Sequence, residues 1–539
     1  ASLQNQWELA LEFYATAGAF ASLFHPGFFC DSVAENEVFR IGREQTDATS
    51  VKAVDVLEPP SGNAFSLLHV LSEVTTVGGH TSTLVNWIRS DRQSQHKIVV
   101  TRQRDFAALN WLRQKLEPFA VELISLDIHL PLLYRASQLR RIVNSGFDAA
   151  LVQAWGSDLV PILAFATDST PPIAYIDHSD HLFWMGSSVA DLVIHQRPIG
   201  AEICEQRRAS KACHVLPIPL ETSCNRVSRE TARKSIGATN HDVVALTIGR
   251  QLKYRPTPER NFFRAAQALT DRHANLTVHV VGVTKDPAKI WAPGLRVEQF
   301  RFHGQVPVNP SLLLSADVYL EGYPFGSQTA LLEAALAGIA PVRAPRCGTT
   351  LLATSDSAVD PLLEVPKSEE QYIQFASNLI ADCRLRHSIA RRIKRSVTSV
   401  HTADGWQASL SELYLRLQHT RHSPSPIRLL PIHEDCVSVA LHRWNRWSEV
   451  GAVTDRELKL VAKAFVNNVM QTQIRRCEYR LLPTIAVRSL ALGRGDRTIV
   501  QMGIHALIRE TVRLSGATTG PQIPRQCRLS KRTDELVLQ

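Results

Sequence analysis

"DVYLEGYPFGSQTALLEAALAGIAPVRAP", residues 317–345, runs from a strand-like segment through a turn of small polar residues into an Ala- and Leu-rich helix. The turn at Gly326, Ser327, Gln328 and Thr329 brings backbone N–H groups to the start of that helix, which suits phosphate or hydroxyl groups. Glu333 lies about one turn inside the helix, where its carboxylate can accept hydrogen bonds from a ribose diol. A structural role is equally open, with Ser327 or Thr329 as the helix cap and Glu333 stabilising the first turn through the helix dipole.

Short β-branched runs separated by helical lengths extend on both sides of this segment. The first series is "FSLLHVLSEV", "HKIVVTR", "FAVELISLD", "FDAALVQAW", "PPIAYIDHS" and "VADLVIHQ", and the second is "HDVVALTIGR", "LTVHVVGV", "LRVEQFRFHGQV", "ADVYLEG" and "APVRAP". Such alternation is the pattern of a doubly wound, largely parallel sheet. We therefore predict an α/β protein with two tandem Rossmann-like domains, at 63–238 and 239–400.

Helical additions are predicted at both ends. Residues 1–62 read as one or two helices and a loop, and amphipathic runs beyond the Pro/Ser linker at 422–431 predict a mostly helical domain at 421–539. This domain is basic: from Arg421 onward there are 19 Lys+Arg against 10 Asp+Glu, whereas the preceding residues hold 41 of each. It could contact an anionic partner or a membrane surface, or the charges could form a solvated helical face. The oligomeric state stays open.

Bulk composition indicates a globular protein. The 539 residues, of which 44% are hydrophobic and 21% charged, are enough for two to four domains. The nine cysteines are scattered without a C-x-x-C pair, which argues against a disulfide framework or zinc ribbon and favours a reducing, cytoplasmic setting. No apolar window is long enough to span a membrane, and the first residues lack the basic start of a signal peptide. We expect a soluble protein.

Two cations follow a predicted strand in "TIGRQLKYRPTPERN". Arg250 and Lys253 come directly after the strand that ends at Gly249, at a position where ligands bind in open α/β sheets. Arg250 as a bidentate fork and Lys253 as a point charge could neutralise a departing diphosphate. The alternative is that both are ordinary surface residues.

A glycine-rich turn precedes a predicted helix in "VTTVGGHTSTLVNW". Gly78 and Gly79 allow the loop to approach a ligand closely, and His80 stands at the helix entrance. The segment is not a G-x-G-x-x-G fingerprint, so it gives little support to a dinucleotide site. A plain tight turn is the alternative.

The segment "AYIDHSDHLFWMG" delivers Asp177, His178, Asp180 and His181 within five residues. These groups indicate an acid/base or a substrate-orienting histidine. A metal site is disfavoured, because the chain offers no helical H-x-x-x-H and no third anchor. Hydrogen bonds that stabilise the loop remain the alternative.

Taken in this order, these places resemble the GT-B superfamily of nucleotide-sugar glycosyltransferases over residues 66–418. The matching segments are "GGHTSTLVNWI", "AYIDHS", "TIGRQLKYR", "FRFHGQV" and "YPFGSQTALLEAALAGIAPV". A further segment, "ARRIKRSVTSVHTADGWQASLSELY", looks like the terminal helices of the superfamily, which cross back to the first domain. A crossover helix is therefore expected at 401–420.

The resemblance implies a donor-binding second domain that needs no metal or other cofactor. Arg250 and Lys253 would hold the diphosphate of a nucleoside diphosphate sugar, expected to be a UDP-sugar, and Glu333 would bind its ribose. Gly326, Ser327, Gln328 and Thr329 would line the phosphate and the sugar.

The first domain would then receive the acceptor, a protein or a polysaccharide. Gly78, Gly79 and His80 would lie on the acceptor side, and His178 would lie beside the transferred sugar. His178 or His181 would serve as the catalytic base.

The predicted donor-binding segment, residues 323–342, differs from that of many retaining members of the superfamily, which carry two acids eight positions apart. Phe325 stands eight positions before Glu333, and the nearest upstream acid is Glu321. The spacing of "PFGSQTALLE" is similar to that of bacterial protein N-glucosyltransferases, relatives of the O-GlcNAc transferases, which invert. An inverting hexosyl- or N-acetylhexosaminyltransferase is therefore favoured.

Two other readings keep the same fold. A sugar-nucleotide 2-epimerase would need acids poised for proton abstraction and usually lacks such long terminal additions. A non-catalytic scaffold or binding protein would use the basic domain as its working surface, but the set of Arg250, Lys253 and Glu333 argues against it.

Overall fold

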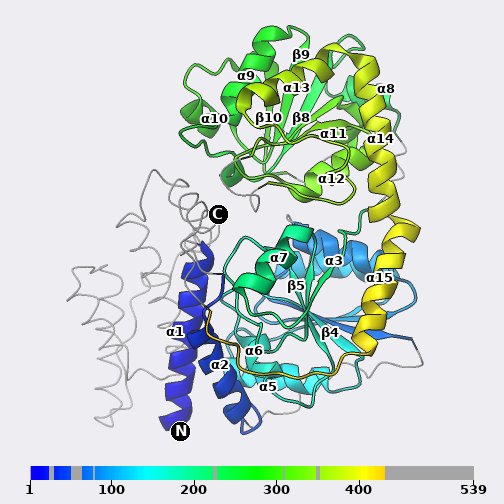
Figure 1. Cartoon of the computed structure of the whole chain (residues 1–539). Helices are drawn as coiled ribbons and strands as arrows, with labels where there is room; N and C mark the ends of the chain where they lie inside the picture. The colour runs from blue at the N-terminus through cyan, green and yellow to red at the C-terminus, as the bar shows by residue number, and fades with distance from the viewer. Residues whose placement is uncertain are drawn as a thin grey trace, which may run out of the picture. The chain divides into compact units, whose positions relative to one another are not determined.

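The computed structural model describes residues 2–23, 29–49, 64–76, 79–221, 227–306, 310–346 and 353–430. All of these residues belong to the first of two compact units, Ala1–Gly451. Gly78, part of the N-terminal extension and nearly all of the predicted basic domain at 421–539 lie outside the described residues. Figure 1 shows the element labels that are used below.

The first domain contains a seven-stranded sheet in which every strand pair is parallel, in the order β3-β2-β1-β4-β5-β6-β7. The strands are β1 (Ser66–Leu71), β2 (Gln95–Val100), β3 (Glu122–Ser125), β4 (Ala149–Gln153), β5 (Ile173–Asp177), β6 (Leu192–His195) and β7 (Cys213–Val215). The helices of this domain are α3 (Gly79–Ser90), α4 (Phe106–Leu116), α5 (Leu132–Val143), α6 (Val160–Phe165) and α7 (Pro198–Arg207), with the 3₁₀ turn η1 (Glu117–Phe119). Every residue of β1, β4, β5 and β6 is buried, because helices cover both faces of such a sheet.

The second domain contains a five-stranded parallel sheet in the order β10-β9-β8-β11-β12. Its strands are β8 (Val243–Ile248), β9 (Leu276–Val281), β10 (Phe300–Gly304), β11 (Val318–Leu320) and β12 (Ala340–Val342). Its helices are α8 (Arg229–Ser235), η2 (Gln251–Tyr254), α9 (Phe262–Arg272), α10 (Lys285–Trp291), η3 (Val297–Gln299), α11 (Pro310–Ser315), α12 (Gln328–Ala337), α13 (Glu369–Ala381) and α14 (Cys383–His401). The predicted fold class, two Rossmann-like α/β domains, is confirmed.

The helix after α14 returns to the first domain. In α14, Ile393 and Val397 join the core that surrounds α12. In α15 (Ala403–Gln418), Trp406 is fully buried against the first sheet and its indole N–H donates to the Pro217 carbonyl at 2.7 Å. The chain therefore crosses between the two domains at the junction of α14 and α15.

The first two helices also pack on the first domain. In α2 (Ser32–Gln45), which follows α1 (Ser2–Leu23), Val38 and Phe39 enter the main core of that domain. The side chain of Asp31 caps α2 by accepting hydrogen bonds from the first backbone N–H groups. Buried Glu35 accepts a hydrogen bond from the Ser188 N–H at 2.6 Å, which ties α2 to the segment before β6.

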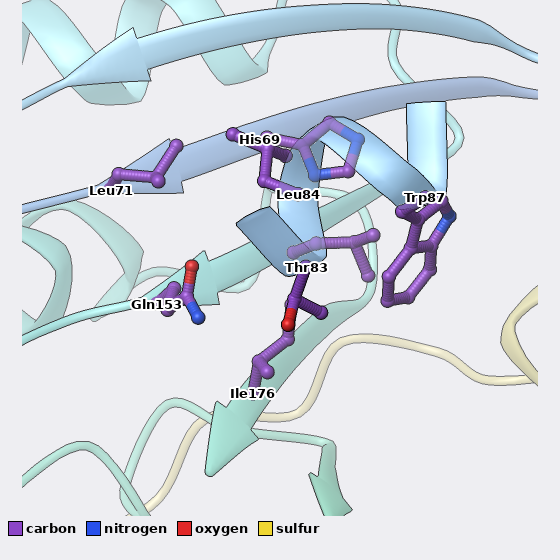
Figure 2. A pocket seen from close by; sticks show the side chains of 8 residues that line it. His69, Leu71, Thr83, Leu84, Trp87, Gln153 and Ile176 are labelled. Carbon is purple, nitrogen blue, oxygen red and sulfur yellow. The ribbon is translucent and has the colours of Figure 1, made fainter. Parts of the chain in front are cut away.

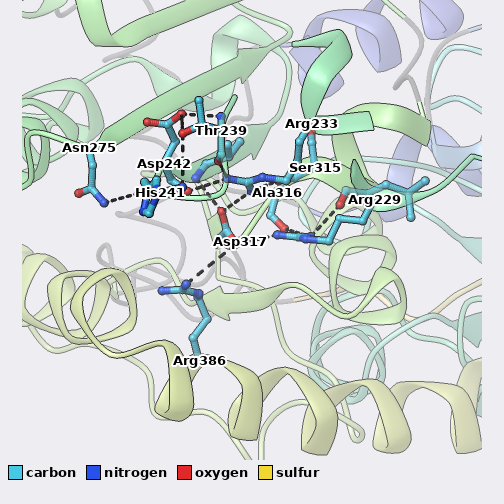
Figure 3. Close-up of polar contacts among 12 residues, drawn as sticks. Arg229, Arg233, Thr239, His241, Asp242, Asn275, Ser315, Ala316, Asp317 and Arg386 are labelled. Carbon is cyan, nitrogen blue, oxygen red and sulfur yellow. Dashed lines mark hydrogen bonds and ion pairs between the residues drawn. The ribbon is translucent and has the colours of Figure 1, made fainter. Parts of the chain in front are cut away.

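Asp317 organises the amino-terminal edge of the second sheet (Figure 3). One carboxylate oxygen accepts from the Val244 N–H and from Arg233, both at 2.9 Å, and the other accepts from Arg229 at 2.6 Å. Arg386 of α14 lies 4.0 Å away. This largely buried carboxylate thus links β8, β11, α8 and α14 at the end of the sheet opposite to the candidate site.

In the part of the chain that the structure describes, no helix has both the length and the apolar composition that crossing a bilayer requires.

Candidate functional site

The candidate residues lie beyond the carboxyl ends of the strands at two topological switch points. In the first sheet the chain order reverses between β1 and β4, and in the second it reverses between β8 and β11. Ligands of doubly wound sheets bind outside these points. The segments that follow β1, β5, β8 and β11 carry every described residue of the predicted site.

Three aromatic rings of the first domain gather at its switch point. The ring centroid of His80 lies 5.8 Å from that of Trp155 and 5.7 Å from that of His178, and Trp155 and His178 are 5.3 Å apart. His80 stands in the first turn of α3, Trp155 follows β4 and His178 follows β5. The structure therefore brings together His80 and His178, which are 98 positions apart, and adds Trp155 to them.

Both histidines are neutral near pH 7. Burial, with His178 and Arg250 nearby, lowers the pKa of His80 to about 3. Burial also lowers the pKa of His178, against the raising effect of Asp177. The Nε2 atom of His178 is buried and has no hydrogen-bond partner among the described residues. A neutral imidazole with a free ring nitrogen can accept a proton.

Asp180 is committed to an ion pair and does not act as a free acid. Arg197 binds both of its carboxylate oxygens, at 2.5 and 2.6 Å. Burial would raise the pKa of Asp180, but Arg197 and His181 hold it below its usual range. Arg197 also donates to the Ala353 carbonyl of the second domain at 2.6 Å, so this pair joins the two domains.

His181, a residue of the first domain, lies close to the predicted donor-binding segment of the second domain. Its ring centroid lies 4.6 Å from that of Phe325. Burial lowers the pKa of His181, and Arg197 and Lys253 act in the same direction, whereas Asp180 raises it. Phe325, eight positions before Glu333, is therefore a packing partner of the candidate base.

Lys253 contacts the same phenylalanine. Its ammonium nitrogen lies 4.4 Å from the Phe325 ring centroid and donates to the Gly326 carbonyl at 2.9 Å. Burial, together with the charges of Arg250 and Arg197, lowers the pKa of Lys253 to about 8. The amine is therefore mostly charged at pH 7.

The turn after β8, which carries Arg250 and Lys253, is anchored by a buried residue. Tyr254, the last residue of η2, is fully buried, and its hydroxyl lies 2.8 Å from the Thr247 hydroxyl of β8. Arg250 precedes η2 in an extended conformation and is exposed. Its charge is among the causes that lower the pKa of both His80 and Lys253, which places it near residues of both domains.

Two glycines from other loops lie close to the start of α12. Ser327 is the N-cap residue, but its side chain makes no capping hydrogen bond. A Cβ added to Gly249 would lie 2.9 Å from the Ser327 hydroxyl, and one added to Gly79 would lie 3.2 Å from the Thr329 hydroxyl. Glycine at both positions allows the loops after β8 and β1 to approach the donor segment closely.

Two predicted donor residues differ in their surroundings. The Gln328 amide donates to the Ser355 carbonyl at 3.0 Å and to Asp356 at 3.2 Å, so it is used within the second domain. The half-buried carboxylate of Glu333 makes no hydrogen bond or ion pair with any described residue, and burial raises its pKa to about 7. Glu333 is therefore the acid of α12 that is available to a ligand.

Sequence reasoning missed three residues of this site: Trp155, Arg197 and Glu321. Glu321 follows β11 and is fully buried, with one oxygen accepting from the Ala344 N–H at 2.8 Å and the other without a partner in the described part of the chain. Burial raises its pKa, although the Ala344 N–H lowers it. The available signal was an acid or an aromatic residue directly after a predicted strand, as in "VYLEG" and "LVQAW".

The packing behind the first-domain residues is tight. A cavity of about 10 Å³ is lined by His69, Leu71, Thr83, Leu84, Trp87, Leu151, Gln153 and Ile176. Figure 2 shows seven of these side chains with labels. This volume has room for about one water molecule. It cannot hold a nucleotide or a sugar.

No protein-family model and no curated protein sequence matches the chain. Among solved structures, it is similar to a glycosyltransferase from Rickettsia africae, with a TM-score of 0.51 and 10% identity over 67% of this chain and 100% of that one. It is also similar to Anabaena HepE in complex with UDP and glucose, with a TM-score of 0.50 and 18% identity over 65% of this chain and 99% of that one. A Thermobaculum terrenum O-GlcNAc transferase mutant superimposes with a TM-score of 0.47 and 15% identity, over 76% and 77% of the two chains.

These similarities agree with the fold of the chain. Two parallel sheets, each with its candidate residues beyond a switch point, and a helix that crosses back to the first domain are present in one chain. The chain therefore has the GT-B fold, as these solved structures do.

Proposed function

We propose that the protein is a glycosyltransferase that moves a sugar from a UDP-sugar to a protein or polysaccharide acceptor. The observation that carries the proposal is the convergence of both domains on Phe325, with His181 on its ring and the Lys253 ammonium 4.4 Å from its centroid. A cation and an imidazole with a lowered pKa thus lie close to the start of α12, where Glu333 has no partner among the described residues. This set provides a leaving-group site, a base and a diol acceptor within one fold.

The donor is held by charge and by hydrogen bonds. Lys253 and Arg250 bind the diphosphate, and the Glu333 carboxylate accepts hydrogen bonds from the ribose hydroxyls. No metal is needed at the diphosphate in this proposal, because two cations neutralise the departing charge. UDP is the nucleotide proposed, since HepE of the same fold was solved with UDP and glucose.

The transfer is proposed to invert the anomeric carbon. The imidazole of His178 or His181 takes the proton of the acceptor group as that group attacks the anomeric carbon. The bond from this carbon to the diphosphate oxygen breaks, and UDP leaves with its negative charge beside Lys253 and Arg250. Neutral histidines can serve as the base at pH 7, and both of these histidines have a lowered pKa. The acceptor, the cytoplasmic location and an anionic contact of the basic domain stay predictions.

Thermal unfolding of the full chain against a panel of nucleotides tests the donor site. A ligand that binds the folded state alone raises stability by mass action, by about 2.7 kcal/mol at 100 times its Kd. We expect UDP and UDP-sugars to raise Tm, and we expect Glu333→Gln to lose most of the shift. Exposed Glu298 provides the matched control, because Glu298→Gln leaves α12 untouched. If no nucleotide raises Tm, the glycosyltransferase proposal fails in favour of a binding protein.

The fate of the donor separates the possible reactions. Incubation with UDP-glucose or UDP-N-acetylglucosamine, followed by NMR of the products, reports slow hydrolysis to one anomer or formation of an epimer. Release of the β-anomer from an α-linked donor supports inverting transfer. Appearance of the C2 epimer would instead assign the protein as a sugar-nucleotide 2-epimerase.

UDP binding is expected to strengthen as pH rises through about 7. Glu333 has a raised pKa of about 7, so the free protein carries the proton below that pH, and a protonated carboxyl is a poorer acceptor for the ribose diol. The Kd for UDP should therefore weaken by up to about tenfold per pH unit below 7. Calorimetric titration from pH 5.5 to 8.5 measures this slope. In Glu333→Gln the dependence should disappear, and a persistent slope would assign the titration to another group.

A further inference from the structure

One edge of the first domain gathers a histidine and two cysteines away from the proposed donor site. His195 is the last residue of β6, Cys204 lies in α7 and Cys213 is the first residue of β7. One potential ligand atom from each lies within 4.8 Å of the other two. His195 and Cys204 are fully buried and Cys213 is half-buried. The β6-α7-β7 crossover brings these residues together, although no C-x-x-C pair marks them in the sequence.

The ring nitrogens of His195 in this cluster have no hydrogen bond with the described residues. Oδ2 of the neighbouring Asp177 also lacks a hydrogen bond within the described residues. The two atoms that face each other, His195 Nδ1 and Asp177 Oδ2, are 3.3 Å apart. A buried ring nitrogen without a hydrogen bond is costly, so the unpartnered Nε2 of His195 points to a ligand at this place.

We propose that His195, Cys204 and Cys213 bind a Zn²⁺ ion. Two thiolates and an imidazole form a soft donor set that suits zinc, whereas magnesium and calcium require oxygen ligands. With Zn–S of about 2.3 Å and Zn–N of about 2.0 Å, ligand atoms of a tetrahedral site are roughly 3.5–3.8 Å apart. The cluster therefore needs to contract by about 1 Å. A water molecule would take the fourth coordination position of the zinc ion, on the side where Cys213 is half-buried.

Asp177 acts as a positioning residue for this site. Because its Oδ2 lies beside His195 Nδ1, it holds the proton on that nitrogen and leaves Nε2 for the metal. Such carboxylate–histidine pairs are the usual outer support of zinc ligands. The other oxygen of Asp177 accepts from the Trp184 indole at 3.1 Å, so the carboxylate is already fixed. Bound zinc would tie α7 and β7 to the strand end from which the segment 177–181 departs.

Cobalt titration of the reduced, metal-free full chain tests the site. Thiolate-to-Co²⁺ absorption in the near ultraviolet is expected to saturate at about one ion per chain and to vanish when Zn²⁺ is added. Cys204→Ser and Cys213→Ser should each lose this absorption. Cys383→Ser, which changes an exposed cysteine of α14, should keep it. The proposal is overturned if the reduced wild type gives no such band, or if the band is unchanged in Cys204→Ser and Cys213→Ser.

Thiol protection in the wild-type chain covers the case in which a serine variant does not fold. Zn²⁺ should slow alkylation of Cys213 at least about tenfold, because a metal-bound thiolate is withdrawn from reaction. Alkylation of Cys383 should not change. Asp177→Asn should weaken zinc affinity about 10- to 100-fold. Equal alkylation rates with and without Zn²⁺ contradict the proposal, and so does a Cys204–Cys213 disulfide that persists in reductant. None of these readouts uses a nucleotide or turnover, so they are independent of the proposed function.

Discussion

Replacement of Lys253 by alanine is expected to reduce kcat about 100- to 1,000-fold, the loss typical when one fixed group that stabilises developing charge is removed. The ammonium donates to the Gly326 carbonyl at 2.9 Å and is oriented by the Phe325 ring, so it is held where the proposed leaving group gains charge. A free solvated lysine could not supply the same stabilisation, because it would have to reorganise during the reaction. Steady-state donor hydrolysis or transfer measures the effect.

The matched control for this variant is Lys289→Ala, which removes an exposed lysine of α10 in the same domain. Both variants should melt within a few degrees of the wild type. Turnover by Lys253→Ala at the rate of Lys289→Ala would remove Lys253 from the donor site. If Arg250→Ala also turned over at the rate of Lys289→Ala, the proposal that these two cations bind the diphosphate would be wrong.

The same lysine predicts an alkaline limit to activity. Its pKa is lowered to about 8 by burial and by Arg250 and Arg197, so the free protein loses this charge as pH rises through 8. Since kcat/KM reports groups of the free enzyme, it should fall above about pH 8. In Lys253→Arg the fall should move to higher pH, because a guanidinium stays charged there. An unmoved profile would assign the limit to a different group.

Replacement of Asp317 by alanine is expected to lower the free energy of unfolding by about 3–5 kcal/mol, the range for loss of one partner from a buried ion pair. The substitution leaves Arg233 and the Val244 N–H without their shared acceptor, and side chains of both Asp317 and Arg233 are at most 10% exposed. It also removes the carboxylate that pairs with Arg229, which keeps its bonds to the Leu314 and Ala316 carbonyls (Figure 3). The second domain should therefore lose much of its stability.

Urea unfolding of this variant should show a lower midpoint with an unchanged slope. The control is Asp271→Ala, which removes a 43%-exposed partner of Arg296 and should cost less than about 1 kcal/mol. A loss in Asp317→Ala no greater than that of the control would show that its arginines find water or other acceptors at little cost.

The fold class followed from the alternation of short apolar runs with helical lengths, since a parallel sheet covered on both faces requires continuous apolar strands. Arg250 and Lys253 follow β8 and His178 follows β5, and residues that follow parallel strands lie at the carboxyl edge of their own sheet. Glu333 lies further on, inside α12. The interactions of the neighbouring side chains could not be predicted from the sequence in this way. Gln328 stands in the same turn as Ser327 and Thr329, but its amide binds Ser355.

The sequence by itself determined the two α/β domains and the segments that follow their strands, because both depend on local apolar periodicity. Only the tertiary structure decided which side chains meet there. Lys253 reaches a carbonyl 73 positions away, and Arg197 joins Asp180 to a carbonyl 156 positions further along the chain. The pairing of His195 with two cysteines likewise depends on how α7 packs between β6 and β7. Such contacts arise from the packing of whole elements, and no local pattern of residues records them.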